Sequence, residues 1–342
     1  FRNHKIFNIT LIHYVIDDQE QIMKKSKITL YILPVLFTCF LAACSHAIDI
    51  TEYRSHENFI PDSRLSSPQS LPEVSLSIIN TGESITTEAF TFSGGRWLTG
   101  FTMLHSAFLI RHPKGTILFD TGLGADIDQQ YKKEMPFYMK PLMTYTKRSC
   151  AKAQLQEAGI DPTQVQSVIV SHLHWDHVSG LEDFPEAMIR ITKEEYDYGE
   201  NMASDDPSFM ASQFDDEGIQ WQFIEFQNKP YDNFTQSLDL YNDGSLVLVP
   251  LPGHTPGSVG MFVNLRSGKR FLLSGGLSWT DEGVRVPTDK FWLSSLIADW
   301  DKEITKQTLV QVHRLMKRYP ELVVVPSHDD RIQKQISLFP EF

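Results

Sequence analysis

The chain has 342 residues, enough for one large domain or two small ones, and its 41% hydrophobic and 22% charged residues are typical of a globular protein with a sizeable core. It carries 31 Lys and Arg against 43 Asp and Glu, a formal net charge of −12 at pH 7. Because phosphate contacts need a basic surface, this acidity argues against a nucleic-acid partner.

The N-terminal part reads as a leader rather than as part of the fold. Residues 1–22 show no usable pattern, and we expect them to be an upstream extension from a misplaced start. A basic stretch begins at Met23, and an apolar run follows over residues 28–43. That run is short for a membrane span, so residues 23–43 are typical of a secretory signal peptide.

The apolar run ends in the letters LAAC at Cys44, which resemble the lipobox of bacterial lipoproteins. Cleavage before Cys44 would leave its thiol as a lipid anchor; the alternative is a plain signal peptide with a chance cysteine. Ser45, where an Asp would be an inner-membrane signal, favours the periplasmic side of the outer membrane of a Gram-negative bacterium. Residues 44–72 are rich in Ser, Pro, Asn and charge, and we expect a flexible tether there, followed by a domain over 73–342.

From residue 74 onward, short apolar runs alternate with helical patterns. Strands are predicted at 74–80, 107–111, 116–119, 168–170, 188–192, 246–249, 260–264, 271–273 and 321–325. Helices are predicted at 147–158, closed by Gly159, and at 300–319, stopped by Pro320. Strands interspersed with helices in two halves indicate an α+β domain.

Two segments look like additions over a cleft. Residues 94–103 combine glycines with large apolar side chains, and they could form a lid or an acyl-binding wall. Equally, Trp97 and Phe101 could simply pack on the sheet. Residues 196–233 form a long polar and aromatic insertion, which we expect to shape one side of a substrate groove.

The run SHLHWDH after the strand predicted at 168–170 is the strongest chemical signal. His172 and His174 lie two residues apart, so on an extended strand end their rings project to the same side. Asp176 and His177 follow where the chain turns. Imidazole and carboxylate are the ligands that zinc prefers when no thiol is present. The alternative is a polar loop with chance histidines, but four ligand-type residues at this spacing favour a metal site.

Two later histidines complete the pattern. His254 lies in the letters PGHTPG after the strand predicted at 246–249, and His328 follows the strand predicted at 321–325. Either alone would be read as an ordinary histidine. Because a rigid sheet fixes the loops at its strand ends, both are candidates to join the first cluster.

HxHxDH, then PGHTPG, then a late strand-end His resembles the metallo-β-lactamase superfamily, over about residues 74–342. The letters FDTG at 119–122 are similar to an early element of that family. The resemblance implies an α+β fold with a four-layer αβ/βα sandwich.

The same resemblance implies a ligand set. His172, His174 and His254 would hold a first zinc. Asp176, His177 and His328 would hold a second. Asp120 would orient a ligand imidazole from behind, although a turn-capping role is the alternative reading of that residue.

The chain departs from the family at Gly276, where many dinuclear relatives carry an Asp that bridges both metals. One or two Zn²⁺ ions are therefore expected, with the second site the weaker one. An Asp introduced at position 276 is expected to strengthen it, unless steric constraints prevent this. The lactonase-like branch commonly has a Tyr three residues later, and this chain has Trp279.

The resemblance implies a zinc-dependent hydrolase whose metal-bound hydroxide attacks a carbonyl, with Asp176 orienting the nucleophile and passing a proton. The expected partner is a small-molecule acyl substrate, a lactone such as an N-acyl homoserine lactone. One alternative is a β-lactam-hydrolysing or other hydrolase of the same superfamily. Another is a metal-binding lipoprotein whose site is inactive at Gly276. The sequence does not indicate an oligomeric state.

Overall fold

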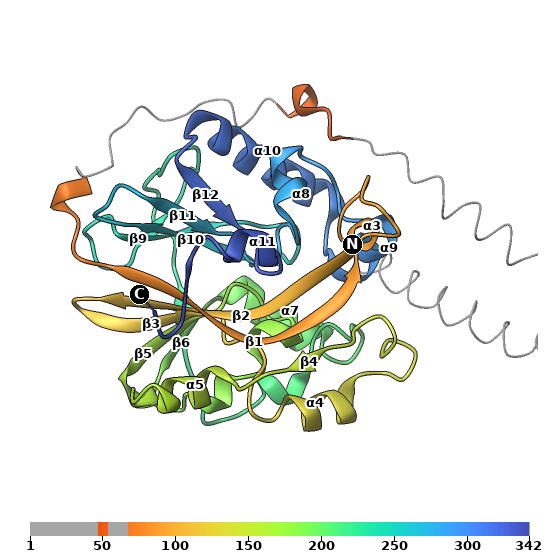
Figure 1. Ribbon diagram of the computed structural model, residues 1–342, viewed down its shortest axis with the longest axis horizontal. Coiled ribbons are helices and arrows are strands. Elements are labelled where there is room, and N and C mark those ends of the chain that lie inside the picture. The colour runs from red at the N-terminus through yellow and green to blue at the C-terminus, as the bar shows by residue number, and fades with distance from the viewer. Residues whose placement is uncertain (1–46, 54–67, 342) are drawn as a thin grey trace, which may run out of the picture. The chain divides into compact units, whose positions relative to one another are not determined.

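Two β-sheets face each other in the computed structural model, and helices cover their outer sides (Figure 1). The structure describes residues 47–53 and 68–341. The expected extension 1–22, the signal peptide 23–43 and the anchor Cys44 lie outside the described residues. Among the helices of the described part, none is long and apolar enough to cross a membrane.

The first sheet is 8-stranded, in the order β13-β1-β2-β3-β5-β6-β7, with β4 paired to β1. Its strands are β1 (Ser75–Thr87), β2 (Gly100–His112), β3 (Gly115–Phe119), β4 (Thr146–Lys147), β5 (Val165–Ile169), β6 (Met188–Thr192), β7 (Gln220–Ile224) and β13 (Ser337–Leu338). Strands β3, β5, β6 and β7 are parallel, so their carboxyl ends meet at one edge.

The second sheet is 5-stranded, in the order β12-β11-β10-β9-β8. Its strands are β8 (Leu238–Asp239), β9 (Leu246–Pro250), β10 (Val259–Asn264), β11 (Arg270–Leu273) and β12 (Leu322–Val325). The continuous apolar runs of β9, β10 and β11 are buried, as expected of strands covered on both faces.

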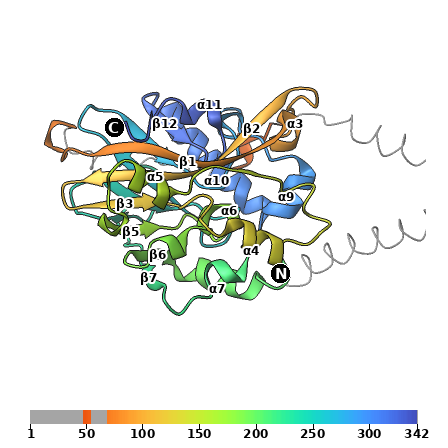
Figure 2. The same cartoon turned by 60° about the horizontal axis from the view of Figure 1, so that its bottom comes forward.

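Helices form the outer layers, with α8 and α10 beyond the second sheet and α5 beyond the first (Figures 1 and 2). The helices are α3 (Glu88–Thr91), α4 (Ile127–Glu134), α5 (Ala151–Glu157), α6 (Trp175–Val178), α7 (Lys193–Met202), α8 (Asp281–Arg285), α9 (Trp292–Ala298), α10 (Lys302–Arg318) and α11 (Asp330–Gln333). Short 3₁₀ turns lie at 50–52, 68–70, 162–164, 181–183 and 211–213.

Three apolar cores account for the layering. Between the sheets, Phe108 and Phe119 of the first pack with Leu248, Met261 and Leu273 of the second. A second core joins the first sheet to α5 and α7, and a third joins the second sheet to α10. The predicted α+β, four-layer αβ/βα sandwich is therefore confirmed.

Helix α10 shows how local sequence produces a layer. Asp301 caps it by accepting hydrogen bonds from the backbone N–H groups of Glu303 and Ile304. Leu309, Val312 and Leu315 recur at helical spacing and pack onto the second sheet. The helix ends just before Pro320, so the prediction at 300–319 is correct to within a few residues.

Two local predictions need correction. The helix predicted at 147–158 starts only at Ala151, because Thr146 and Lys147 pair with β1 instead. In the segment 94–103, the last four residues belong to β2 and Phe101 is buried, while Trp97 packs edge-on against Phe291 with ring centroids 5.2 Å apart. The packing alternative therefore describes Phe101, whereas Trp97 packs against Phe291 at the start of α9 rather than on the sheet.

Residues 47–53 differ from the flexible tether expected over 44–72. The backbone N–H of Ile48 donates to Pro287, the hydroxyl of Tyr53 donates to Glu303 at 2.7 Å, and Arg314 binds the carbonyl of Ile50. The stretch 196–233 is also more regular than predicted, because it contains part of α7 and the whole of β7.

Candidate metal centre

Loops from both sheets meet at one end of the sandwich. Asp120 follows β3 and the HxHxDH run follows β5, both at the carboxyl edge of the first sheet. His254 follows β9, and His328 follows β12 in the second sheet. The two sheets thus bring together residues more than 150 positions apart in the sequence.

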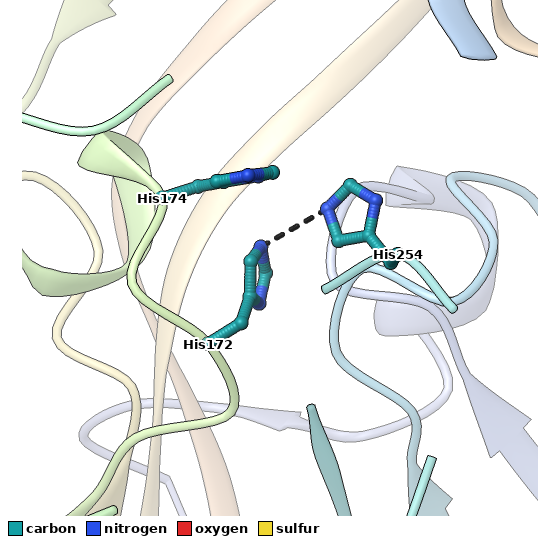
Figure 3. Close-up of side chains that lie close together, drawn as sticks. All are labelled: His172, His174 and His254. Atoms are coloured by element: carbon teal, nitrogen blue, oxygen red, sulfur yellow. Dashed lines mark hydrogen bonds between the residues drawn. The ribbon is translucent and has the colours of Figure 1, made fainter. Parts of the chain in front are cut away.

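His172, His174 and His254 form a compact triangle (Figure 3). Each pair of ring centroids is 4.6 Å apart, the rings are nearly perpendicular, and all three side chains are buried. The Nε2 atoms of His172 and His254 lie 3.1 Å apart.

Hydrogen bonds behind two of these rings fix their protonation. Ser171 Oγ donates to Asp120, so it must accept from the Nδ1–H of His172 at 2.9 Å. His254 donates its own Nδ1–H to Asp299 at 2.9 Å. Both Nε2 atoms therefore carry lone pairs, which face each other across 3.1 Å. Such an arrangement suits a cation held between them.

The electrostatics of the triangle favour neutral, metal-binding imidazoles. Burial, reinforced by the neighbouring imidazoles, lowers the pKa of His172 well below its usual value, and burial lowers the pKa of His254 to about 4. Neutral imidazole is the form that coordinates zinc, so the residues present fit the metal that the sequence resemblance implies.

A buried ion pair supports His254 from behind. Asp299 Oδ1 accepts from both His254 and Lys290, the latter at 2.7 Å. Although burial opposes ionisation, Lys290 and His254 hold the pKa of Asp299 at about 2. The carboxylate thus stays charged and orients the imidazole. Neither Asp299 nor Lys290 was identified from the sequence.

A second group gathers around Asp176. Its Oδ2 lies 2.9 Å from His105 Nδ1, 3.7 Å from His328 Nε2 and 3.9 Å from His177 Nε2. The His177 Nε2 is buried and has no hydrogen-bond partner among the residues that the structure describes. Although burial opposes it, the surrounding imidazoles hold the pKa of Asp176 well below its usual range. The sequence analysis did not identify His105, which lies in the interior of β2.

Asp120 lies directly behind this cluster. It accepts from the backbone N–H and the hydroxyl of Ser171, and its Oδ2 accepts from His177 Nδ1 at 2.7 Å. The residue has a positive φ of 58°, a strained conformation that the hydrogen bonds offset. The geometry matches the orienting role expected for Asp120.

Glu195 of α7 connects the two loops that carry the histidine triangle. One oxygen accepts from the backbone N–H of Leu173 at 2.8 Å, and the other accepts from Gly257 at 3.2 Å. Leu173 lies between the first two ligands, and Gly257 follows the third. Burial raises the pKa of Glu195 to about 7.

Position 276 has no room for a side chain. A Cβ added to Gly276 would lie 2.1 Å from His254 Cδ2 and 3.0 Å from His172 Cε1. His254 thus occupies the space that a side chain at 276 would need. The constraint on an Asp here is space rather than a left-handed backbone angle.

A cavity of about 190 Å³ opens above the histidines. Its walls are largely apolar, with Ile85, Phe90, Leu142, Trp279 and Ile297 among them. Trp279 stacks on Phe90 with ring centroids 6.1 Å apart, and its ring lies nearly perpendicular to that of His328 at a centroid distance of 6.3 Å. The 196–233 segment contributes Ser208 to the wall, and Phe209 packs against His174.

Comparison with known proteins places this geometry in a family context. Residues 101–328 match the protein family described as the metallo-beta-lactamase superfamily. The chain is 32% identical over 179 residues to the N-acyl homoserine lactonase AttM of Azorhizobium caulinodans, covering 51% of this chain and 64% of that protein, thus less than two thirds of its length. It is 28% identical over 243 residues to AttM of Rhizobium radiobacter, covering 69% and 85%.

One solved structure, an N-acyl homoserine lactone hydrolase with the product N-hexanoyl-L-homoserine at its catalytic metal center, superposes with a TM-score of 0.62. The two chains are 19% identical, and the match covers 79% of this chain and 99% of the other. At that identity the likeness shows the fold.

Proposed function

We propose a function for this chain on the premise that it belongs to the metallo-β-lactamase superfamily of hydrolases. It is a zinc-dependent hydrolase that opens the ring of N-acyl homoserine lactones or related lactones. The observation that carries the proposal is the buried triangle of His172, His174 and His254, at the base of an apolar-walled cavity. The relatives named as lactonases support the choice of substrate class.

The residues of the site suit ring opening. A bound zinc would lower the pKa of coordinated water and polarise the substrate carbonyl. Asp176, which the surrounding imidazoles keep ionised, would orient the attacking water and carry its proton toward the leaving oxygen. The apolar side chains around the mouth suit an acyl chain, whereas Trp279 offers no hydroxyl to the departing oxygen.

We propose that one or two zinc ions bind. The triangle supplies three imidazoles to the first and leaves a fourth position for water or substrate. The second, near Asp176, His177 and His328, lacks the bridging carboxylate of many relatives, so it should be lost first to a chelator.

Metal content and substrate turnover together test the proposal. Purified chain should contain zinc and should hydrolyse N-hexanoyl homoserine lactone faster than a chromogenic cephalosporin or a thioester. The variant His172→Ala/His174→Ala should lose the metal of the triangle. Preference for the cephalosporin would indicate a β-lactam hydrolase, and bound zinc without any turnover would indicate an inactive metal-binding protein.

We further propose that the mature protein is lipid-anchored through Cys44 on the periplasmic side of the outer membrane. The support is the basic stretch from Met23, the apolar run 28–43 and the letters LAAC. Cys44→Ala should abolish acyl labelling and membrane-fraction association. A soluble protein with Cys44 intact would contradict the anchor.

A further inference from the structure

The imidazole of His105 lies against the carboxylate of Asp176, in addition to those of His177 and His328. The residue lies in β2, where its backbone neighbour Leu104 also binds the loop of His328 through the N–H of Leu104 and the carbonyl of His328 at 3.1 Å. The side chain of His105 is 3% exposed, and its Nδ1 lies 2.9 Å from Asp176 Oδ2. His105, Asp176 and His328 form a group that could hold a metal ion.

A hydrogen-bond chain fixes the orientation of the His105 lone pair. Ser84 Oγ donates to the carbonyl of Thr144, which can only accept. The same hydroxyl therefore accepts from the Nε2–H of His105, at 2.7 Å. In the neutral ring, Nδ1 then carries a lone pair that faces the carboxylate of Asp176. Two acceptors at 2.9 Å repel each other unless a cation lies between them or beside both.

The neighbouring imidazoles are arranged in the same way. His328 donates its Nδ1–H to the carbonyl of Leu104 at 2.9 Å, and His177 donates its Nδ1–H to Asp120 at 2.7 Å. The Nε2 atoms of both rings are thereby left as acceptors near Asp176. The three nitrogens lie 2.9, 3.7 and 3.9 Å from Asp176 Oδ2. Donor atoms around a tetrahedral zinc lie roughly 3.3 Å apart, a value within this range.

We propose that His105 is a protein ligand of the second metal, together with Asp176, His177 and His328. His105 would restore the number of ligands that the site loses because Gly276 has no carboxylate. It would not restore the negative charge, because the imidazole ring is neutral. The inference rests on the proposed function, since it takes the second metal for granted.

A division of roles between the two metals follows. Zinc with four protein ligands is typical of closed, structural sites, whereas three ligands leave an open position for chemistry. With His105 the second site is closed by three nitrogens and one oxygen. The triangle of His172, His174 and His254 would then be the open site. His105 therefore defines which metal meets the substrate.

Metal titration of the chelator-treated full chain tests this assignment. Zinc would be added to the wild type and to His105→Ala, His105→Asn and His112→Gln, in competition with a chromophoric chelator. His112 is the matched control, because it is a buried histidine on the same strand that bonds Asp243 instead. His105→Asn keeps an N–H near the Nδ1 position that can hold Asp176, but an amide is a poor zinc ligand.

We expect the wild type and His112→Gln to bind two zinc ions. Both His105 variants should bind the second at least tenfold more weakly while keeping the first, and the retained first metal shows that the variants are folded. In the cobalt-loaded proteins, proton NMR should show one fewer paramagnetically shifted imidazole N–H in the His105 variants.

Each other outcome has a distinct meaning. Unchanged second-metal affinity in His105→Asn, with loss in His105→Ala, would make His105 a hydrogen-bonding support of Asp176 and would overturn the assignment. Two unchanged affinities in both variants, or a wild type that binds zinc only at the triangle, would also overturn it while leaving the proposed function standing. A wild type that binds no zinc would defeat the proposed function itself.

Discussion

The geometry of the first metal site depends on the lack of a side chain at Gly276. With no Cβ, the backbone approaches His254 and His172 closely enough for their Nε2 atoms to meet at 3.1 Å. The sequence alone suggested a lost carboxylate. The structure shows instead a position that the ligand His254 itself has filled.

We therefore predict that Gly276→Ala and Gly276→Asp both lower the affinity of the first metal by more than tenfold, because the new Cβ displaces His254. Zinc titration measures this. Gly100→Ala is the control, since a Cβ there meets nothing within 4 Å. A stronger second-metal site in well-folded Gly276→Asp would show that the backbone moves aside and that the original expectation for this substitution was sound.

Most of the metal-site residues that could be identified from the sequence lie close together in the chain, whereas His105, which could not, is isolated. His172, His174, Asp176 and His177 lie within six positions, so their spacing is itself a signal. His105 is a single residue inside a strand, without neighbours of its kind. Its role depends on the pairing of β2 with distant segments, which no local pattern contains.

At the scale of elements, the segment around α9 supports the His254 loop. Asp299 is the C-cap of α9, and the backbone N–H groups of Trp300 and Asp301 donate to His254 and Gly253. The sequence predicted a helix from residue 300, but not that the segment before it holds the buried Lys290–Asp299 pair. Such pairs carry no periodicity.

Asp299→Asn should lower the free energy of unfolding by about 3 kcal/mol, since it leaves Lys290 buried without its counter-charge. It should also weaken the first metal by about tenfold or more. In Lys290→Met/Asp299→Asn the stability should largely return while the metal affinity stays low. Urea unfolding and zinc titration of the three variants check both effects. If Asp299→Asn matches the wild type in both, the pair does not support the site.

Helix α7 connects the two metal loops through Glu195, and its effect depends on pH. The pKa of this carboxyl is raised from 4.5 to about 7, so the folded chain holds the proton more tightly than the unfolded chain. The free energy of unfolding should therefore fall, through this group, by about 3 kcal/mol as pH rises from about 4.5 to about 7.

Glu195→Gln should lack that component, so its stability relative to the wild type should improve over the same pH interval. Urea unfolding of chelator-treated proteins at several pH values measures the difference. Glu200→Gln is the control, because this exposed residue lies on the same helix. A Glu195→Gln variant that follows the wild-type pH profile would show that the buried carboxyl does not titrate in this range.

At the scale of the whole molecule, the long apolar strands and α10 could be predicted from the sequence because their hydrophobic pattern is local. The layered fold could be predicted from the HxHxDH and PGHTPG motifs. Short elements such as β4 and β7 could not, since their pairing is set by the sheet. The closure of the two sheets then brings the loops after β5, β9 and β12 to one cavity, with Asp120 of the loop after β3 buried behind His177.

The central claim is that this cavity opens lactones with zinc held by His172, His174 and His254. The most direct measurement is the initial rate of N-hexanoyl homoserine lactone opening by the chelator-treated chain as zinc is added. We predict no activity without metal, a rate that rises with bound zinc, and none at any zinc level in His172→Ala/His174→Ala. A rate that is independent of zinc, or a zinc-loaded wild type that opens no lactone, would contradict the claim.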